Sequence, residues 1–161
     1  FDPVCSVGLG LIKRSEVAGI EPGNGTAYDL PRLGKLIDRI LNELMCAAGK
    51  VVGSFVLRQG PDPSYGHIYE GKWLDDSMPY YVIHRVTSLP AAHGVFSAIV
   101  SYCIQHSDNL RIDTHRDNHI MRHLVEKYGF TYCGIIHLSR ARGAERLAYQ
   151  MISRNVCKVP Q

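Results

Sequence analysis

A chain of 161 residues is long enough for one domain with a hydrophobic core and too short for two independent domains. Hydrophobic residues make up 45% of the chain and charged residues 20%, as in globular proteins, and no apolar run approaches the roughly 20 residues that span a bilayer. The 18 basic and 15 acidic side chains give a net charge of +3, too mild and too dispersed to indicate nucleic-acid binding.

Cysteine usage and the start of the chain bear on the compartment. The five cysteines are odd in number, widely spaced and without a CxxC pair, which favours reduced thiols. The first ten residues lack the basic end and apolar stretch of a signal peptide, and also an initiating methionine. We therefore expect a cytoplasmic protein with no membrane partner, and leave its true beginning open.

The first half of the chain predicts one helix and two strands. Residues 1–28 show little periodicity and several glycines, so irregular structure is expected there. From Asp29, a good cap residue, apolar residues recur at three- and four-residue steps as far as Leu44, which predicts a helix that ends near Gly49. The β-branched and aromatic run 50–57 predicts a strand, and residues 67–70 predict the next one.

The second half alternates strands with helices. Strands are predicted over residues 80–87 and 109–114, and helices with one apolar stripe each over residues 93–106 and 118–128. Residues 131–138 and 146–152 resemble a terminal hairpin. This succession indicates a mixed α/β sheet in a single domain over residues 29–155, followed by a tail at 156–161.

The turn at residues 89–97 is the first candidate for a binding site. It leaves a strand and opens a helix, so the first amides of that helix lack intrahelical partners and favour an anion. Gly94 would let a ligand approach the backbone closely. A glycine near a helix start is also what a turn alone requires.

Several sequence segments resemble the GNAT superfamily of N-acyltransferases over roughly residues 51–152. They are YVIHRVT (81–87), HGVFS (93–97), NLRIDT (109–114), Asn118 and EKYGFTYCG (126–134). The resemblance implies an α/β acyl-CoA N-acyltransferase fold with a central mixed, mostly antiparallel sheet and flanking helices. It also implies transfer of an acetyl group from acetyl-CoA to a primary amine by direct attack.

The resemblance also implies which residues contact the cofactor. In the family the fourth strand's backbone pairs with the pantetheine arm, the loop amides hold the pyrophosphate, and an asparagine at the start of the later helix lies near the cofactor. These roles fall on Val86, Ser88, His93, Gly94, Val95, Phe96, Ser97 and Asn118. Asn118 is equally a good helix cap, and both roles can hold.

The chain departs from the family pattern in three places. Ala91 stands where the family's loop has Gln or Arg, and Phe96 where it has Gly or Ala. Val125 occupies the position of a frequent general-acid tyrosine, for which Tyr128 is the candidate substitute; the alternative is that Tyr128 belongs to the apolar stripe of its helix. The predicted first helix passes almost directly into the strand at 50, so the N-terminal part reads as shortened or altered, without the family's second helix.

Acyl transfer needs a base to take the proton of the attacking amine. Glu70 and His84 are the candidates; the alternatives are an exposed strand-end carboxylate and a core histidine. A backbone amide of the fourth strand would polarise the thioester oxygen. The spacing of His115, His119 and His123 permits a metal, but solvated polar residues are the simpler account, and no metal is expected.

Two other classes of function stay open. A catalytically silent CoA-binding or interaction domain is favoured by the departures at Ala91, Phe96 and Val125. A fragment that needs a partner chain is favoured by the unpatterned front. The acceptor, a small-molecule or peptide amine, is not identified by the sequence, and a homodimer stays open.

Overall fold

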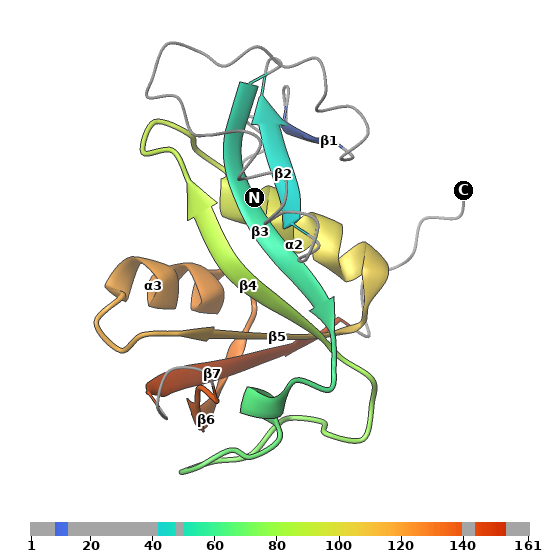
Figure 1. Cartoon of the computed structure of the whole chain (residues 1–161), viewed down its shortest axis with the longest axis vertical. Helices are drawn as coiled ribbons and strands as arrows, with labels where there is room; N and C mark the ends of the chain where they lie inside the picture. The colour runs from blue at the N-terminus through green and yellow to red at the C-terminus, as the bar shows by residue number, and fades with distance from the viewer. Residues whose placement is uncertain (1–8, 13–41, 48–49, 140–143, 154–161) are drawn as a thin grey trace. The chain divides into compact units, whose positions relative to one another are not determined.

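The computed structural model describes residues 9–12, 42–47, 50–139 and 144–153. The elements follow along the chain as β1 (Leu9–Ile12), β2 (Asn42–Ala47), β3 (Lys50–Gln59), the short 3-10 helix η2 (Pro63–Tyr65), β4 (Tyr81–Ser88), α2 (Val95–His106), β5 (Asn109–Thr114), α3 (His119–Lys127), β6 (Thr131–His137) and β7 (Glu145–Ile152) (Figure 1). Neighbouring strands form hydrogen bonds in the order β1-β2-β3-β4-β5-β7-β6. The chain divides into a first unit, residues 1–57 and 84–99, and a second unit, residues 58–83 and 100–161.

The first unit begins with two antiparallel pairings. β1 pairs with β2, and β2 pairs with β3 (Figure 1). β1 lies inside the segment that the sequence predicted to be irregular. Among the side chains that the structure describes in this unit, the buried apolar ones come from β3 and from the start of α2: Phe55, Val56, Leu57, Val95, Phe96 and Ile99.

The predicted helix between Asp29 and Gly49 is wrong over residues 42–47, which form β2. Its residues before 42 lie outside the described part of the chain. The end of its apolar stripe is a short run, LMCA, that a strand accommodates as well as a helix. Only two residues separate β2 from β3, the usual length of a tight hairpin connection, and the antiparallel ladder with β3 decides the local structure.

The predicted strand over residues 67–70 is also wrong. Only Tyr69 makes a β-bridge, with Ile135 of β6. Glu70 follows with a φ of 54°, in the left-handed region, so the extended path stops there. The other predicted strands and both later helices are confirmed, with ends within about two residues of the prediction.

The second unit is built on β5, β7 and β6 beside the first residues of β4. β5 runs parallel to β4 and antiparallel to β7, and β6 and β7 form the predicted terminal hairpin. Mixed pairing of this kind, with helices between the strands, confirms the α/β class. The buried cluster of this unit consists of Tyr65, Trp73, Val82, Cys133, Ile136 and Ala148.

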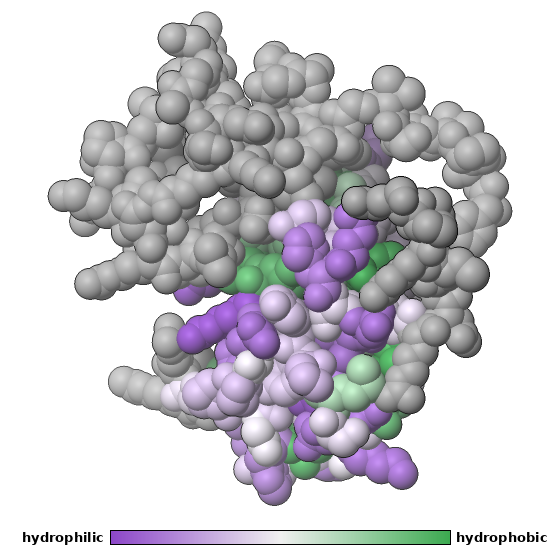
Figure 2. All heavy atoms as spheres, turned by 90° about the vertical axis from the view of Figure 1, so that its right-hand side faces the viewer, coloured by the Kyte–Doolittle hydropathy of each residue, from purple (hydrophilic) through white to green (hydrophobic). Residues whose placement is uncertain are grey.

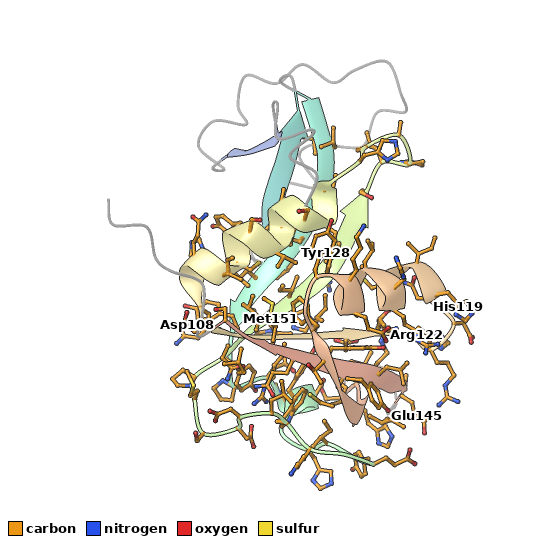
Figure 3. The ribbon with its side chains drawn as sticks, turned by 180° about the vertical axis from the view of Figure 1, so that it is seen from behind. Asp108, His119, Arg122, Tyr128, Glu145 and Met151 are labelled. Atoms are coloured by element: carbon orange, nitrogen blue, oxygen red, sulfur yellow. The ribbon has the colours of Figure 1, made fainter. Side chains whose placement is uncertain are left out.

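The two faces of β7 meet different partners because alternate side chains point to opposite sides. Gln150 accepts a hydrogen bond from the Leu74 N–H at 2.6 Å, so segment 60–80 lies on its face. On the other face lies Tyr149, whose pKa is raised by burial, while Arg122 of α3 acts in the opposite direction. Figure 3 shows Glu145 and Met151 at the two ends of β7.

α3 ends where the sequence predicted a glycine-phenylalanine stop. The Gly129 N–H donates to the Glu126 carbonyl at 3.1 Å and the Phe130 N–H to the Val125 carbonyl at 3.0 Å, the pattern of a Schellman cap. Gly129 has a φ of 92°, which an L side chain rarely adopts.

Tyr65 forms a buried hydrogen bond in the second unit. Its hydroxyl donates to Asp113 Oδ1 at 2.5 Å, and Asp113 Oδ2 accepts from Arg146 Nε at 2.8 Å. Burial, followed by the Asp113 charge, raises the pKa of Tyr65 well above 10.0. The folded chain therefore holds this proton at pH values where the unfolded chain releases it.

The Tyr65→Phe variant is expected to lose about 1–2 kcal/mol of unfolding free energy at pH 7, the usual cost of a buried hydrogen bond. Above pH ~10 the Tyr65 phenol makes the parent chain lose up to about 1.4 kcal/mol of stability per pH unit, since the unfolded state binds fewer protons. The variant lacks that loss, so the two stabilities should converge. Urea unfolding from pH 7 to 11 measures this.

Tyr69→Phe is the control for that experiment because Tyr69 is 43% exposed. Its unfolding free energy should run parallel to that of the parent chain across the alkaline range. A constant difference between parent and Tyr65→Phe up to pH 11 would contradict the role of the Tyr65 proton.

Candidate functional site

β4 leaves its partner strand halfway along its length. The parallel ladder joins Tyr81, Val82 and Ile83 to Leu110, Arg111 and Ile112, and the described residues show no β4–β5 pairing beyond Ile83. The rest of β4 belongs to the first unit, where Arg85 has a φ of 52° and interrupts the regular strand. β4 also pairs with β3 along its other edge, so an extended ligand can pair only with the edge on which the β5 ladder ends at Ile83.

The turn between β4 and α2 is held by two backbone hydrogen bonds, one to β3 and one within the turn. The Leu89 N–H donates to the Val52 carbonyl at 2.8 Å, and the Ala92 N–H donates to the Leu89 carbonyl at 2.9 Å. Gly94 follows with a φ of 75°. Since an L side chain is strained at this φ, the sequence needs glycine at this position.

α2 presents its N-terminal amides directly after Gly94. The first helical hydrogen bond runs from the Ala98 N–H to the Gly94 carbonyl at 3.0 Å, so the first turn of α2, whose N–H groups have no acceptor within the helix itself, begins directly after Gly94. The first turn of α2 contains no acidic residue that would compete for this end. The helix dipole therefore favours an anion here.

Phe96 does not obstruct this helix end with its side chain. Its exposed fraction is 6% and that of Val95 is 3%, so both side chains pack into the protein and only their backbone belongs to the turn. His93 and Ala91 are exposed, and Ser97 is half-buried. The departure from the family pattern at Phe96 is therefore compatible with an accessible turn.

The remaining cofactor candidates lie on β4 and α3. Val86 is half-buried and Ser88 exposed, both in the first unit. Asn118 caps α3 in the second unit, where its Oδ1 accepts a hydrogen bond from the Met121 N–H at 3.0 Å. The capping role of Asn118 is confirmed, and its cofactor contact stays a prediction.

Tyr128 is the C-cap residue of α3 (Figure 3). Its ring is half-buried, with Lys127 Nζ 5.8 Å from the ring centroid. Val125, at the family's tyrosine position, is fully buried and has no proton to donate. Tyr128 thus stays the candidate acid.

The two candidate bases lie in different units. His84 is half-buried on β4 in the first unit. Glu70 is exposed in the second unit, beside Gly71, where an added Cβ would overlap the Cys133 carbonyl of β6. Glu70 directly follows Tyr69, which bridges to Ile135 in the middle of β6. Tyr128, the candidate acid, instead precedes β6 in the chain, so Glu70 and Tyr128 occupy different places in the second unit.

The histidines of α3 and the loop before it are exposed. His115 Nδ1 lies 3.5 Å from Asp117 Oδ2, and His119 and His123 are also exposed. Among the described residues, no three or more His, Cys, Asp or Glu side chains are placed to hold a metal.

Neither described helix has the length and apolarity needed to cross a membrane. On the face that Figure 2 shows, hydrophilic and near-neutral residues cover most of the described surface.

Gly53 of β3, to which the sequence pattern assigns no role, packs against Thr87 and Val95, on either side of the turn. An added Cβ at Gly53 would lie 2.7 Å from the Thr87 carbonyl oxygen and 2.8 Å from Val95 Cγ1. The available signal was a lone glycine inside a β-branched strand, which often marks a close approach of backbone.

Comparison with solved structures gives many similar proteins. The chain is similar to a GNAT-family acetyltransferase from Streptococcus agalactiae 2603, with 31% sequence identity over 76% of this chain and 72% of that one and a TM-score of 0.65. No protein-family model matches the chain, and neither does any curated protein sequence.

More distant structures share the fold. The ribosomal-protein-alanine N-acetyltransferase from Brucella melitensis is 15% identical, over 79% of this chain and 80% of that one, with a TM-score of 0.52. The Bacillus subtilis N-acetyltransferase YlbP, solved in complex with coenzyme A, is 13% identical, over 79% of this chain and 84% of that one, with a TM-score of 0.51.

Proposed function

The chain belongs to the GNAT superfamily and is an acyltransferase with a CoA-based acyl donor, and from this premise we propose that it moves an acetyl group from acetyl-CoA to a primary amine by direct attack. The observation that carries the proposal is the turn at Gly94, which opens α2 with a φ of 75° and no acidic residue in its first turn. A helix start of this kind suits the doubly charged pyrophosphate of CoA.

The proposal assigns the two ends of the donor to different backbone groups. The amides of residues 93–97 hold the pyrophosphate, and the backbone of Val86 and Ser88 pairs with the pantetheine arm. Support for the second assignment comes from the β4–β5 ladder, whose last described rung joins Ile83 and Ile112. Asn118 contacts the cofactor while it caps α3.

The reaction needs no metal and no covalent intermediate. The amine nitrogen attacks the thioester carbonyl carbon, a C–N bond forms, and the C–S bond breaks. The amine proton passes to a base, and the thiolate of CoA takes a proton from Tyr128. A β4 backbone amide stabilises the oxyanion.

Glu70 and His84 compete for the role of base. The pH–rate profiles of Glu70→Gln and His84→Gln separate them, since only the variant that lacks the base should lose the acidic limb of the profile. A profile unchanged in both variants would assign proton removal to water.

The acceptor class is an amine of a small molecule or a peptide. The name of the Brucella melitensis neighbour, which acts on a ribosomal-protein alanine, supports peptide amino termini as one group to test. An acetylation screen over polyamines, amino acids, aminoglycosides and peptides identifies the acceptor.

Calorimetric titration with acetyl-CoA and with CoA tests the proposal. Saturable binding of both, followed by acetylation of an amine in the screen, is the expected result. Binding without turnover of any amine would favour a silent CoA-binding domain, and no heat with either ligand at millimolar concentration would overturn the proposal.

A further inference from the structure

Three consecutive residues of β3 contact the turn that precedes α2 or the elements that flank it, namely the end of β4 and the start of α2. The Val52 carbonyl accepts the Leu89 N–H at 2.8 Å, and the Ser54 hydroxyl lies 3.0 Å from the Thr87 hydroxyl. Between them, Gly53 faces the Thr87 carbonyl. All of these residues belong to the first unit.

Gly53 leaves no room for a side chain. Its added Cβ would lie 2.7 Å from the Thr87 oxygen, about 0.7 Å closer than the 3.4 Å of ordinary contact, and 2.8 Å from Val95 Cγ1. Thr87 precedes the turn and Val95 follows it, so Gly53 touches both of its ends. The Thr87 oxygen is a backbone atom, so it cannot rotate away from an added Cβ as the end of a side chain can.

β3 is also irregular at this place. Met45 of β2 pairs with Gly53, and Cys46 pairs with Val51, so Val52 is an extra residue in β3. A bulge of this kind bends the strand and redirects its neighbours. It brings the Val52 carbonyl to the Leu89 N–H while Gly53 keeps the backbone close to Thr87.

We propose that the clamp formed by Val52, Gly53 and Ser54 positions the turn at residues 89–94, between β4 and α2, for acyl-CoA, with Gly53 as its positioning residue. This inference rests on the proposed function, since it assigns the turn to the pyrophosphate. Gly53 touches no ligand. It acts by keeping the amides at the start of α2 in place, and anion binding by fixed amides is sensitive to small displacements.

The Gly53→Ala variant is expected to weaken CoA binding about tenfold, a loss of ~1.4 kcal/mol, because β3 and the turn must move apart. Ser54→Ala, which removes only the hydroxyl contact, should weaken it about twofold to threefold. Calorimetric titration with CoA measures both. If Gly53→Ala does not fold, Ser54→Ala still tests the clamp.

Two controls separate positioning from general stability. Gly66→Ala adds a methyl group with its nearest neighbour at 3.7 Å and a φ of −72°, so it should bind CoA as the parent chain does. Tyr65→Phe lowers stability without a described contact to the turn, and it too should bind CoA normally. Equal weakening in Tyr65→Phe and Gly53→Ala would overturn the positioning role.

Hydrogen exchange tests the clamp without a ligand. In Gly53→Ala the amides of a peptide covering residues 88–98 should exchange faster, while those of β5 and β7 keep their rates. If the parent chain binds no CoA, the proposed function fails, and the exchange result still decides whether the clamp exists. Unchanged exchange together with unchanged CoA affinity would contradict the clamp itself.

Discussion

Replacing Gly94 with glutamate is expected to weaken acetyl-CoA binding about 100-fold, which corresponds to ~2.7 kcal/mol. Gly94 has a φ of 75°, where an L residue costs about 1–2 kcal/mol, so the turn relaxes and displaces its amides. The new carboxylate also occupies the positive end of α2 and repels the phosphates of the donor. Calorimetric titration with acetyl-CoA measures the loss.

The chain should still fold in this variant, because an acidic side chain at a helix N-terminus is favourable when no ligand is present. Gly94→Ala keeps the strain and omits the charge, so its affinity should lie between those of the parent and Gly94→Glu. Gly66→Glu is the matched surface control, since Gly66 is exposed with an ordinary helical φ of −72°.

Salt separates the two causes. Raising the ionic strength screens the repulsion and should bring Gly94→Glu closer to Gly94→Ala. Parent-like affinity in Gly94→Glu would mean that the pyrophosphate does not bind at this turn. An equal loss in Gly66→Glu would mean that the effect is one of net charge.

The second half of the fold could be predicted because each element has a local signal. The run 109–114 is bounded as predicted, and Asn118 caps α3 as its residue type suggests. β2 was missed because an apolar run of four residues fits both periods. The decision came from pairing with β3, which is a non-local contact.

β5 shows why alternation alone misleads. Polar and apolar residues alternate through NLRIDT, which predicts a strand with one solvated face. Instead, segment 60–80 covers that face, and Arg111 and Asn109 are fully buried. The polar side chains of β5 bind this segment: Asn109 contacts the Met78 carbonyl, Arg111 contacts Asp76, and Asp113 accepts from Tyr65.

The candidate site was predictable where backbone geometry follows from residue type. Gly94 in the left-handed region is such a case. The supporting contacts of Gly53 were not, since they depend on how β3 packs against Thr87 and Val95 in three dimensions. The catalytic base is equally hard to predict from the sequence, because the position of Glu70 depends on the tight packing of its neighbour Gly71 against β6.

Gln150→Leu is expected to destabilise the chain by about 3–5 kcal/mol, because Gln150 joins segment 60–80 to the sheet. Its side chain is fully buried. Oε1 accepts from the Leu74 and Asp75 N–H groups at 2.6 and 3.3 Å, and Nε2 donates to the Asp75 carbonyl and to Asn109 Oδ1, both at 2.7 Å. Leucine fills the volume but removes all four hydrogen bonds of the amide, while the Asp75 carbonyl keeps another donor, Arg111 Nη2 at 3.2 Å. Urea unfolding measures the loss.

Arg111→Met is the informative comparison, since Arg111 pairs directly with Gln150 across the ladder. Its guanidinium carbon lies 4.0 Å from the centroid of the Trp73 ring and 3.8 Å from that of Tyr80, and Nη2 donates to Asp76 Oδ1 at 2.7 Å. In the described residues its Nε and Nη1 are buried without a hydrogen-bond partner, which lowers the net value of burying the charge.

Asp76 is 70% exposed and stays hydrated when Arg111 is removed, so methionine should cost only about 1–2 kcal/mol. The charged residue is thus expected to matter less than the neutral one, because Gln150→Leu removes four hydrogen bonds of one buried amide, whereas the Asp75 carbonyl keeps a donor in either variant. Gln105→Leu, on the exposed face of α2, should change stability by less than about 0.5 kcal/mol. If Arg111→Met proves more costly than Gln150→Leu, segment 60–80 is held by the cation and its two rings rather than by the amide.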